Sequence, residues 1–206
     1  EYDVAWSVTA APNCAVRTIR QGIYSVTVGG TVTVGPGTYS QTNYITQSLT
    51  LVASGAVTVT APDSTPGRNL FHVSANGVTI DGFVLVVNRP YAVAGIYASD
   101  RDRLTVRNCV IQDSGTGGTF VNPYLLTNAV GIAVLASDDA VAESIVISNT
   151  RITINQGGSS DDITRGIWLH EVHGAVIGNE IDALTHDALI QYSHGSATTI
   201  SGNSFR

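Results

Sequence analysis

The stretch from Val106 to Ile111 reads Val-Arg-Asn-Cys-Val-Ile and opens and closes on an apolar residue, with Asn108 at its third position. This pattern (apolar, any, small or Asn, any, any, apolar) occurs six times in the chain. Successive copies begin 28, 26, 41, 29 and 24 residues apart. The copies are 52–57, 80–85, 106–111, 147–152, 176–181 and 200–205. A repeat of this length predicts stacked supersecondary units.

Each copy predicts two short strands that meet at a bend. Apolar residues alternate with other residues on both sides of the centre, as a strand with one buried face requires. Glycine and asparagine tolerate the left-handed backbone conformation of a tight bend. The expected bend residues are Ser54, Gly82, Asn108, Asn149, Gly178 and Gly202. We expect the closing apolar residues to form one inward column: Leu85, Ile111, Ile152, Ile181 and Phe205.

A second motif precedes most copies and predicts a third strand in each period. It occurs at 71–73, 95–98, 131–134, 166–169 and 187–190. In a solenoid of such units, each strand pairs with its equivalent one coil later, at about 4.8 Å. The sequence therefore predicts an all-β fold, a right-handed parallel β-helix of about seven coils, as a single domain over 1–206.

The repeats resemble the right-handed β-helix modules of the pectin-lyase-like family, and the resemblance extends from Ala15 to Phe205. The segments 15–23 and 30–39 are similar to the amphipathic capping helix and first coil that open such modules, so we expect a cap helix over 15–26. Members of this family include surface proteins, polysaccharide lyases and sugar hydrolases. The resemblance therefore implies a fold and leaves several activities open.

Composition excludes several classes of protein. The 206 residues are 43% hydrophobic and 13% charged, which is enough to bury one sizeable core. A net charge of −6 without any lysine argues against a nucleic-acid partner. No apolar run approaches the roughly 20 residues of a membrane-spanning helix. Because the chain lacks methionine, Glu1 is not a translation start, and we expect a processed chain or a fragment that is secreted or displayed at the cell surface.

The chain has features outside the repeat. Two insertions, 115–128 and 156–165, would leave the same corner of successive coils, either as tolerated surface loops or as the wall of a site. The last copy ends one residue before Arg206, so we expect self-association, another protein or further chain to cover the C-terminal coil. Cys109 should be a buried free thiol, too far from Cys14 for a disulfide.

Aromatic side chains mark one candidate binding face. With Ile96, Ile132, Ile167 and Ala188 taken as inward, the next residues form an outward column of Tyr97, Ala133, Trp168 and Leu189, preceded by His72. A second outward column would hold Ser74, Ser99, Leu135, His170 and Gln191. Aromatic rings can support the C–H face of a sugar ring. We therefore expect Tyr97, Trp168, His170 and Gln191 to bind a glycan; in the alternative, the insertion 115–128 covers the two large rings.

Carboxylates and histidines give the candidates for catalysis: Asp138, Asp139, His173 and His194. Imidazole near carboxylates suits acid/base chemistry or a transition metal, whereas histidines at solvated turns need no function. Asp138-Asp139 and His194-Gly195 are similar to signatures of β-helical polygalacturonases, although the neighbouring Gly, Asn-Thr-Asp and Arg-Ile-Lys elements are missing. By the same resemblance, a lyase would use Ca²⁺ and an arginine base, here Arg101, Arg103 or Arg165.

Three functions follow from this reading. The first is a non-catalytic scaffold of a secreted or cell-surface protein with a glycan-binding face, which needs no metal or cofactor. The second is a polysaccharide lyase or glycoside hydrolase on the same face. The third is a structural subunit that polymerises end to end. The few residues outside the coils favour the first, because polysaccharide clefts are usually walled by long loops.

Overall fold

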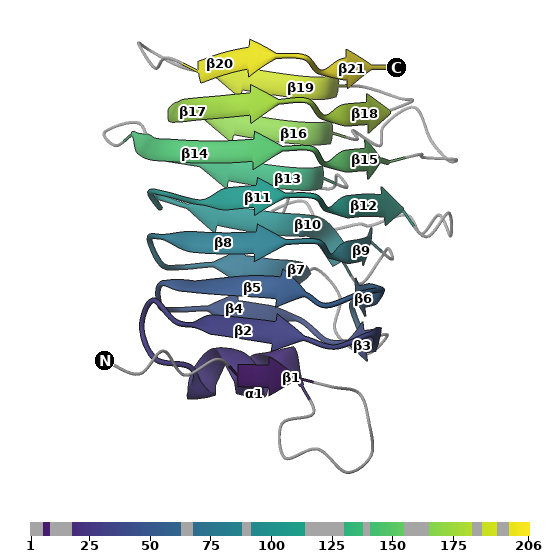
Figure 1. Cartoon of the computed structure of the whole chain (residues 1–206). Coiled ribbons are helices and arrows are strands. Elements are labelled where there is room, and N and C mark those ends of the chain that lie inside the picture. The colour runs from purple at the N-terminus through teal and green to yellow at the C-terminus, as the bar shows by residue number, and fades with distance from the viewer. Residues whose placement is uncertain are drawn as a thin grey trace.

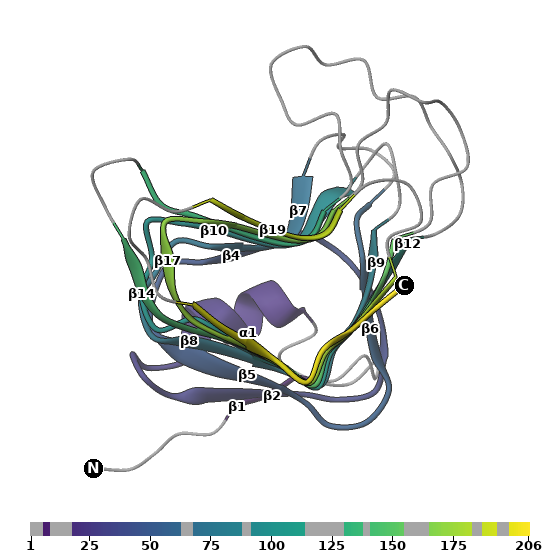
Figure 2. The ribbon, with the colours of Figure 1, turned by 90° about the horizontal axis from the view of Figure 1, so that it is seen from above.

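The computed structural model describes residues 6–8, 18–62, 68–87, 92–113, 130–137, 141–154, 165–182, 187–192 and 198–206. Their strands form three parallel sheets in which each strand pairs with the equivalent strand of the next coil (Figure 1). Seen from the C-terminal end, the coils advance toward the viewer while turning counter-clockwise (Figure 2). The fold is therefore the predicted right-handed parallel β-helix.

Each coil visits the three sheets, here called A, B and C, in the same order. Sheet A consists of β1 (Trp6–Val8), β2 (Thr31–Val34), β5 (Leu49–Ala53), β8 (Val78–Asp81), β11 (Thr105–Arg107), β14 (Ala142–Ser148), β17 (Val172–Ile177) and β20 (Thr198–Ser201). Sheet B consists of β3 (Gly37–Ser40), β6 (Val57–Thr60), β9 (Val84–Val87), β12 (Val110–Asp113), β15 (Arg151–Thr153), β18 (Glu180–Asp182) and β21 (Ser204–Phe205). Sheet C consists of β4 (Asn43–Ile45), β7 (Arg68–Val73), β10 (Ala92–Ser99), β13 (Val130–Leu135), β16 (Arg165–His170) and β19 (Asp187–Tyr192).

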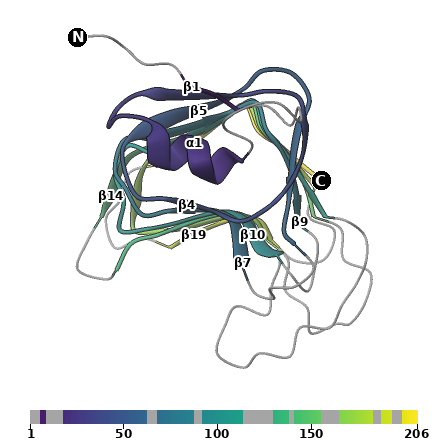
Figure 3. The same cartoon turned by 90° about the horizontal axis from the view of Figure 1, so that it is seen from below.

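A short helix, α1 (Ile19–Ser25), lies across the N-terminal opening of the coil (Figure 3). The side chain of Thr18 caps it by accepting a hydrogen bond from the backbone N–H of Gln21 at 3.1 Å. Ile19 and Ile23 are buried against the first coil. The cap helix predicted over 15–26 is therefore present within those bounds, and residues 15–17 lie outside the described part of the chain.

The predicted inward column is confirmed in sheet B. Leu85, Ile111, Ile152, Ile181 and Phe205 are register partners in successive strands. The first four are fully buried, whereas Phe205 in the last coil is 47% exposed. Apolar side chains that point inward from all three sheets join this column in one continuous core.

The bends between sheets A and B also follow the prediction, except in the first copy. The expected residues Gly82, Asn108, Asn149, Gly178 and Gly202 all have positive φ angles, between 48° and 83°. In the first copy the prediction is wrong, because Leu51 rather than Val52 pairs with Ile80. That coil is longer at its bend, and its positive φ falls at Gly55 rather than Ser54.

A ladder of side chains follows the inner side of these bends. One column runs through Phe83, Cys109, Thr150, Asn179 and Asn203, and its polar members replace apolar ones toward the C-terminus. Asn179 Oδ1 accepts the backbone N–H of Thr150 at 2.9 Å, and Asn203 Oδ1 accepts the backbone N–H of Asn179 at 2.9 Å. Each buried amide is thus satisfied by the coil that follows it.

Candidate functional site

The outer face of sheet C carries a column of large aromatic side chains. Its register partners in successive strands are Tyr44, His72, Tyr97, Ala133 and Trp168. Their inward neighbours, including Ile96, are buried in the core. Because side chains alternate between the two faces of a strand, the rings must lie on the outer face. We call Tyr44, His72, Tyr97 and Trp168 the aromatic strip.

Three rings of the strip pack against one another along the axis of the β-helix. The centroids of Tyr44 and His72 are 5.2 Å apart with an interplanar angle of 28°, so these rings are stacked. His72 and Tyr97 are also 5.2 Å apart, but at 71°, in an edge-to-face arrangement. Both geometries are favourable for aromatic pairs and hold each ring in place. These three rings consequently form an ordered apolar surface that spans three coils.

Trp168 lies farther along the strip and makes different contacts. The guanidinium carbon of Arg165, at the start of the same strand, is 4.5 Å from the centroid of the indole ring. Tyr97, Leu135 and Trp168 pack against a small second cluster, Ala94, Val130 and Ala133, which is itself buried. Tyr97 and Trp168 are therefore half-buried. This burial lies between the two alternatives that the sequence left open, a fully exposed binding face and fully covered rings.

Burial affects the charge state of the strip. Partial burial lowers the pKa of His72 from its ordinary value of 6.5, and the positive charge of Arg101 lowers it further. His72 is consequently neutral at pH 7. The strip at that pH consists of neutral rings, with Arg165 beside one end and Arg101 beside the middle.

The second outward column is confirmed for three of its residues. Ser99 pairs with Leu135, and Leu135 pairs with His170. Nδ1 of His170 lies 2.9 Å from the carbonyl oxygen of Ala136, which holds the imidazole against the preceding coil. His170 therefore lies beside the aromatic strip, one column away from Trp168.

In β19 the predicted register is wrong by one residue. Leu189 pairs with the inward Ile167 and packs against the core, and Gln191 pairs with the inward Leu169. The residues of β19 that pair with Trp168 and His170 are Ile190 and Tyr192. Ala188 thus lies opposite Gly166, where a Cβ atom on the glycine would be 2.5 Å from the Ala188 carbonyl oxygen. Neither Leu189 nor Gln191 is part of the outer face.

Of the candidate catalytic residues the structure describes His173, which lies near the start of β17, after the corner between sheets C and A. Nδ1 of His173 lies 2.8 Å from Oε1 of Glu143, an exposed pair one coil apart. Asp138, Asp139 and His194 lie outside the described residues. Within the described ranges, no group of three His, Cys, Asp or Glu side chains is placed to hold a metal ion.

Two aspartates at this corner support the backbone of the following coil. Asp100 accepts the backbone N–H of Ser137 at 2.7 Å, and this bond is the main cause of the lowered pKa of its carboxyl group. Asp102 accepts the backbone N–H of Glu143 at 2.9 Å. The two aspartates of the alternating Asp-Arg-Asp-Arg segment thus have a structural role.

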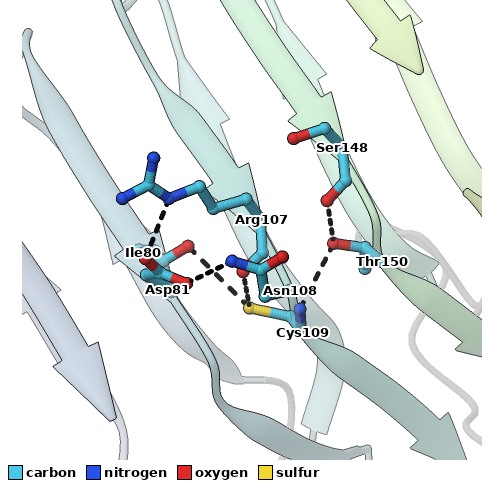
Figure 4. A network of polar contacts seen from close by, with 7 residues as sticks. All are labelled: Ile80, Asp81, Arg107, Asn108, Cys109, Ser148 and Thr150. Carbon is cyan, nitrogen blue, oxygen red and sulfur yellow. Dashed lines mark hydrogen bonds and ion pairs between the residues drawn. The ribbon is translucent and has the colours of Figure 1, made fainter. Parts of the chain in front are cut away.

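Cys109 is a buried free thiol, as the sequence predicts. Its sulfur lies 3.2 Å from the carbonyl oxygen of Arg107, and burial raises its pKa to about 11 (Figure 4). Nearby on the surface, Arg107 and Asn108 both donate to the carboxylate of Asp81 at 2.8 Å. The bonds to Asp81 link two coils at the bend. Because burial raises its pKa, the thiol of Cys109 is protonated and unreactive at neutral pH. Cys14 lies outside the described residues.

Sequence reasoning missed Tyr44 as a member of the strip. Its coil lacks the Gly-Ile motif that located the other outward rings. The signal was the alternation of Tyr44 with Asn43 and Ile45, which are both fully buried. The sequence analysis named Arg165 as a candidate base of a lyase, but it did not predict the contact between Arg165 and Trp168.

Comparisons with known proteins give partial similarities. No family model matches the chain. A cell surface glycoprotein of Methanothermus fervidus is 31% identical over 94 residues, which make up 46% of this chain and 15% of that protein. The chain therefore spans only a small part of the length of this relative.

Several solved structures resemble the chain at low sequence identity. YbhC of Escherichia coli is 12% identical with a TM-score of 0.49, over 97% of this chain and 71% of that one. A pectin methylesterase mutant in complex with a hexasaccharide is 10% identical with a TM-score of 0.45, over 89% and 80%. The pectin methylesterase of Aspergillus niger is 14% identical with a TM-score of 0.42, over 98% and 85%.

Within the part of the chain that the structure describes, no helix is long and apolar enough to cross a bilayer.

Proposed function

We propose that this chain is a non-catalytic β-helical module of a secreted or cell-surface protein, and that the outer face of sheet C binds a glycan. The observation that carries the proposal is the aromatic strip. Tyr44, His72 and Tyr97 form a continuous row of ring contacts on successive coils, the first stacked and the second edge to face. Such a row places apolar ring surface on each of three successive coils along the axis.

The chemistry of the strip suits a carbohydrate. The C–H face of a pyranose ring packs on an aromatic ring, while the hydroxyl groups around its edge need hydrogen-bonding partners. His170 and Ser99 lie one column away and bring polar atoms to the edge of the strip. A rigid platform loses little conformational entropy when a ligand binds.

The cell-surface part of the proposal draws support from one relative. The matching protein of Methanothermus fervidus is described as a cell surface glycoprotein, and the match covers 46% of this chain. A β-helix of stacked coils is stiff along its axis, because each coil packs on both neighbours. A stiff rod with a binding strip along one side would suit a protein displayed outside the cell.

The test is glycan binding by variants of the strip. Binding partners from a glycan array are titrated by calorimetry against wild type, Tyr44→Ala and Tyr97→Ala. Each substitution should weaken binding by about 1 to 3 kcal/mol, because contact area and dispersion are lost together. Tyr24→Ala is the matched control, since Tyr24 is 62% exposed on α1 at the end of the β-helix.

Two results would contradict the proposal. Equal affinities for wild type and both strip variants would place the glycan elsewhere, and an array without any binder would leave a scaffold alone. The same polysaccharide panel is assayed for new reducing ends and unsaturated sugars. Release of either would contradict the non-catalytic part, and Asp139→Asn and His194→Ala would then be compared with wild type.

A further inference from the structure

Buried hydrogen-bond donors without partners gather at sheet C. Among the side chains that the structure describes, five polar atoms are buried and unpaired: Arg101 Nε, Arg165 Nε, Arg165 Nη1, Trp168 Nε1 and Asp182 Oδ1. Four of the five are donors; Arg165 and Trp168 lie on β16 of sheet C, and Arg101 lies two residues after the end of β10. Buried polar atoms normally have a partner, so each exception requires an explanation.

Three of these donors belong to one pair of residues. Arg165 and Trp168 lie on β16, and the guanidinium of Arg165 lies over the indole ring at 4.5 Å. Stacking on the ring gives the N–H groups at the edge of the guanidinium no hydrogen-bond partner, because the contact uses its face. Nε, Nη1 and the indole Nε1 consequently have the same requirement, a nearby acceptor.

The nature of the missing acceptor follows from the charge of the donors. A guanidinium removed from water is stabilised best by an anionic oxygen, and its fork of N–H groups matches the two oxygens of a carboxylate or sulfate. Asp182 Oδ1 is the acceptor among the five unpaired atoms. Because it has no hydrogen-bond partner itself, it does not accept from any of the three donors. An external anion would supply an anionic oxygen of the kind these donors lack.

We propose that Arg165 and Trp168 form an oxyanion-binding site that accepts a carboxylate or sulfate group. Arg165 supplies the charge and two N–H donors, and Trp168 supplies one N–H donor and supports the guanidinium from below. The site does not require the glycan proposal, because a free anion would use the same donors. The anion is either inorganic or a substituent of a larger ligand.

The test uses Trp168 as its own reporter. The chain has two tryptophans, so Trp6→Phe leaves Trp168 as the single one. Sodium sulfate is titrated into this protein at constant ionic strength, set with sodium chloride, and indole fluorescence is followed. We expect a saturable change with sulfate that a matched chloride series does not produce. Glucuronate, glucose and a sulfated monosaccharide then distinguish a free anion from a sugar-borne one.

Three further variants assign the effect to the site. Arg165→Gln in the same background should weaken sulfate binding at least tenfold, and Arg165→Lys should weaken it less, because it keeps the charge but loses the fork. Arg107→Gln is the control, since Arg107 is already paired with Asp81 at 2.8 Å. Circular dichroism checks folding, and Arg165→Lys carries the test if Arg165→Gln does not fold.

The outcomes are distinct. Saturable binding lost in the Arg165 variants and kept in Arg107→Gln supports the site. The same response in every variant, or an unsaturable response in wild type, overturns it. Because the readout is inorganic sulfate, its failure is separate from a failure of glycan binding at Tyr44 and Tyr97.

Discussion

Ile152 tests the inward column at a single residue. It is fully buried between its register partners Ile111 and Ile181. Ile152→Asp would bury an unpaired carboxylate in this column. It should lower the free energy of unfolding by about 3 to 5 kcal/mol. Chemical denaturation measures this loss. Gln112→Asp, on the exposed face of the same sheet, should change stability by less than about 0.5 kcal/mol.

An unchanged midpoint for Ile152→Asp would contradict the column. A large loss in Gln112→Asp would instead show that any carboxylate in sheet B is destabilising.

His72 makes the stability of the molecule depend on pH. Its pKa in the folded protein lies below the ordinary 6.5, so the unfolded chain binds the proton more readily. Protonation of His72 therefore lowers the free energy of unfolding. This loss is absent well above pH 6.5, grows as the pH falls below that value, and is complete below the pKa of His72 in the folded protein. His72→Phe keeps a ring between Tyr44 and Tyr97 but cannot titrate, so its stability should fall less over this interval.

The measurement is the free energy of unfolding of both proteins at a series of pH values on either side of 6.5. Parallel curves would show that His72 does not contribute. Asp100 and Glu180, whose pKa values are also lowered, lose their stabilisation in a more acidic range and affect both proteins alike.

At the scale of the strand and bend, Asn149 separates conformational strain from packing. Its φ is 48°, and its backbone N–H donates to the carbonyl of Ile177 at 3.1 Å. Asn149→Val should lower the free energy of unfolding by about 1 to 2 kcal/mol, because a β-branched residue is disfavoured at positive φ. Asn149→Gly, which suits the same φ, should remain within about 1 kcal/mol of wild type. Thermal denaturation compares the three proteins.

Similar losses in both Asn149 variants would mean that the asparagine side chain, and not the backbone conformation, stabilises the bend.

The elements were predictable wherever two independent signals agreed. Alternation and a bend residue together located most strands of sheets A and B, as at Val106 and Asn108. In β19 only alternation was available, and Leu189 was placed one residue out of register. The missing signal was the pairing itself, because Ala188 lies opposite Gly166 rather than opposite Ile167.

The strip was predictable in part for the same reason. Tyr97 and Trp168 follow the Gly-Ile motif, so their outward direction could be read from the sequence. Tyr44 does not follow that motif, and the contact between Arg165 and Trp168 depends on side-chain conformations that alternation does not specify.

At the scale of the whole molecule, the coils should differ in local stability. Central strands pair on both sides, whereas β19, β20 and β21 lie at one end of their sheets. Ile200 is 43% exposed and Phe205 is 47% exposed there, although both occupy inward positions. In this 206-residue chain, amide hydrogen exchange followed by mass spectrometry should be fastest in these strands and slowest around β8 to β14.

Uniform protection from β2 to β21 would show that the chain opens as one cooperative unit. Slow exchange in β20 and β21 alone would suggest that a second molecule covers that end.

The ladder through Thr150, Asn179 and Asn203 also bears on how such a chain changes in length during evolution. Asn179 accepts the backbone N–H of Thr150 in the coil before it and donates its own backbone N–H to Asn203 in the coil after it. A duplicated or deleted segment therefore preserves these bonds only when it contains a whole turn, cut at equivalent positions. A gain or loss of chain that passes through these bends should therefore involve whole coils, whereas changes at the other corners only lengthen or shorten a loop.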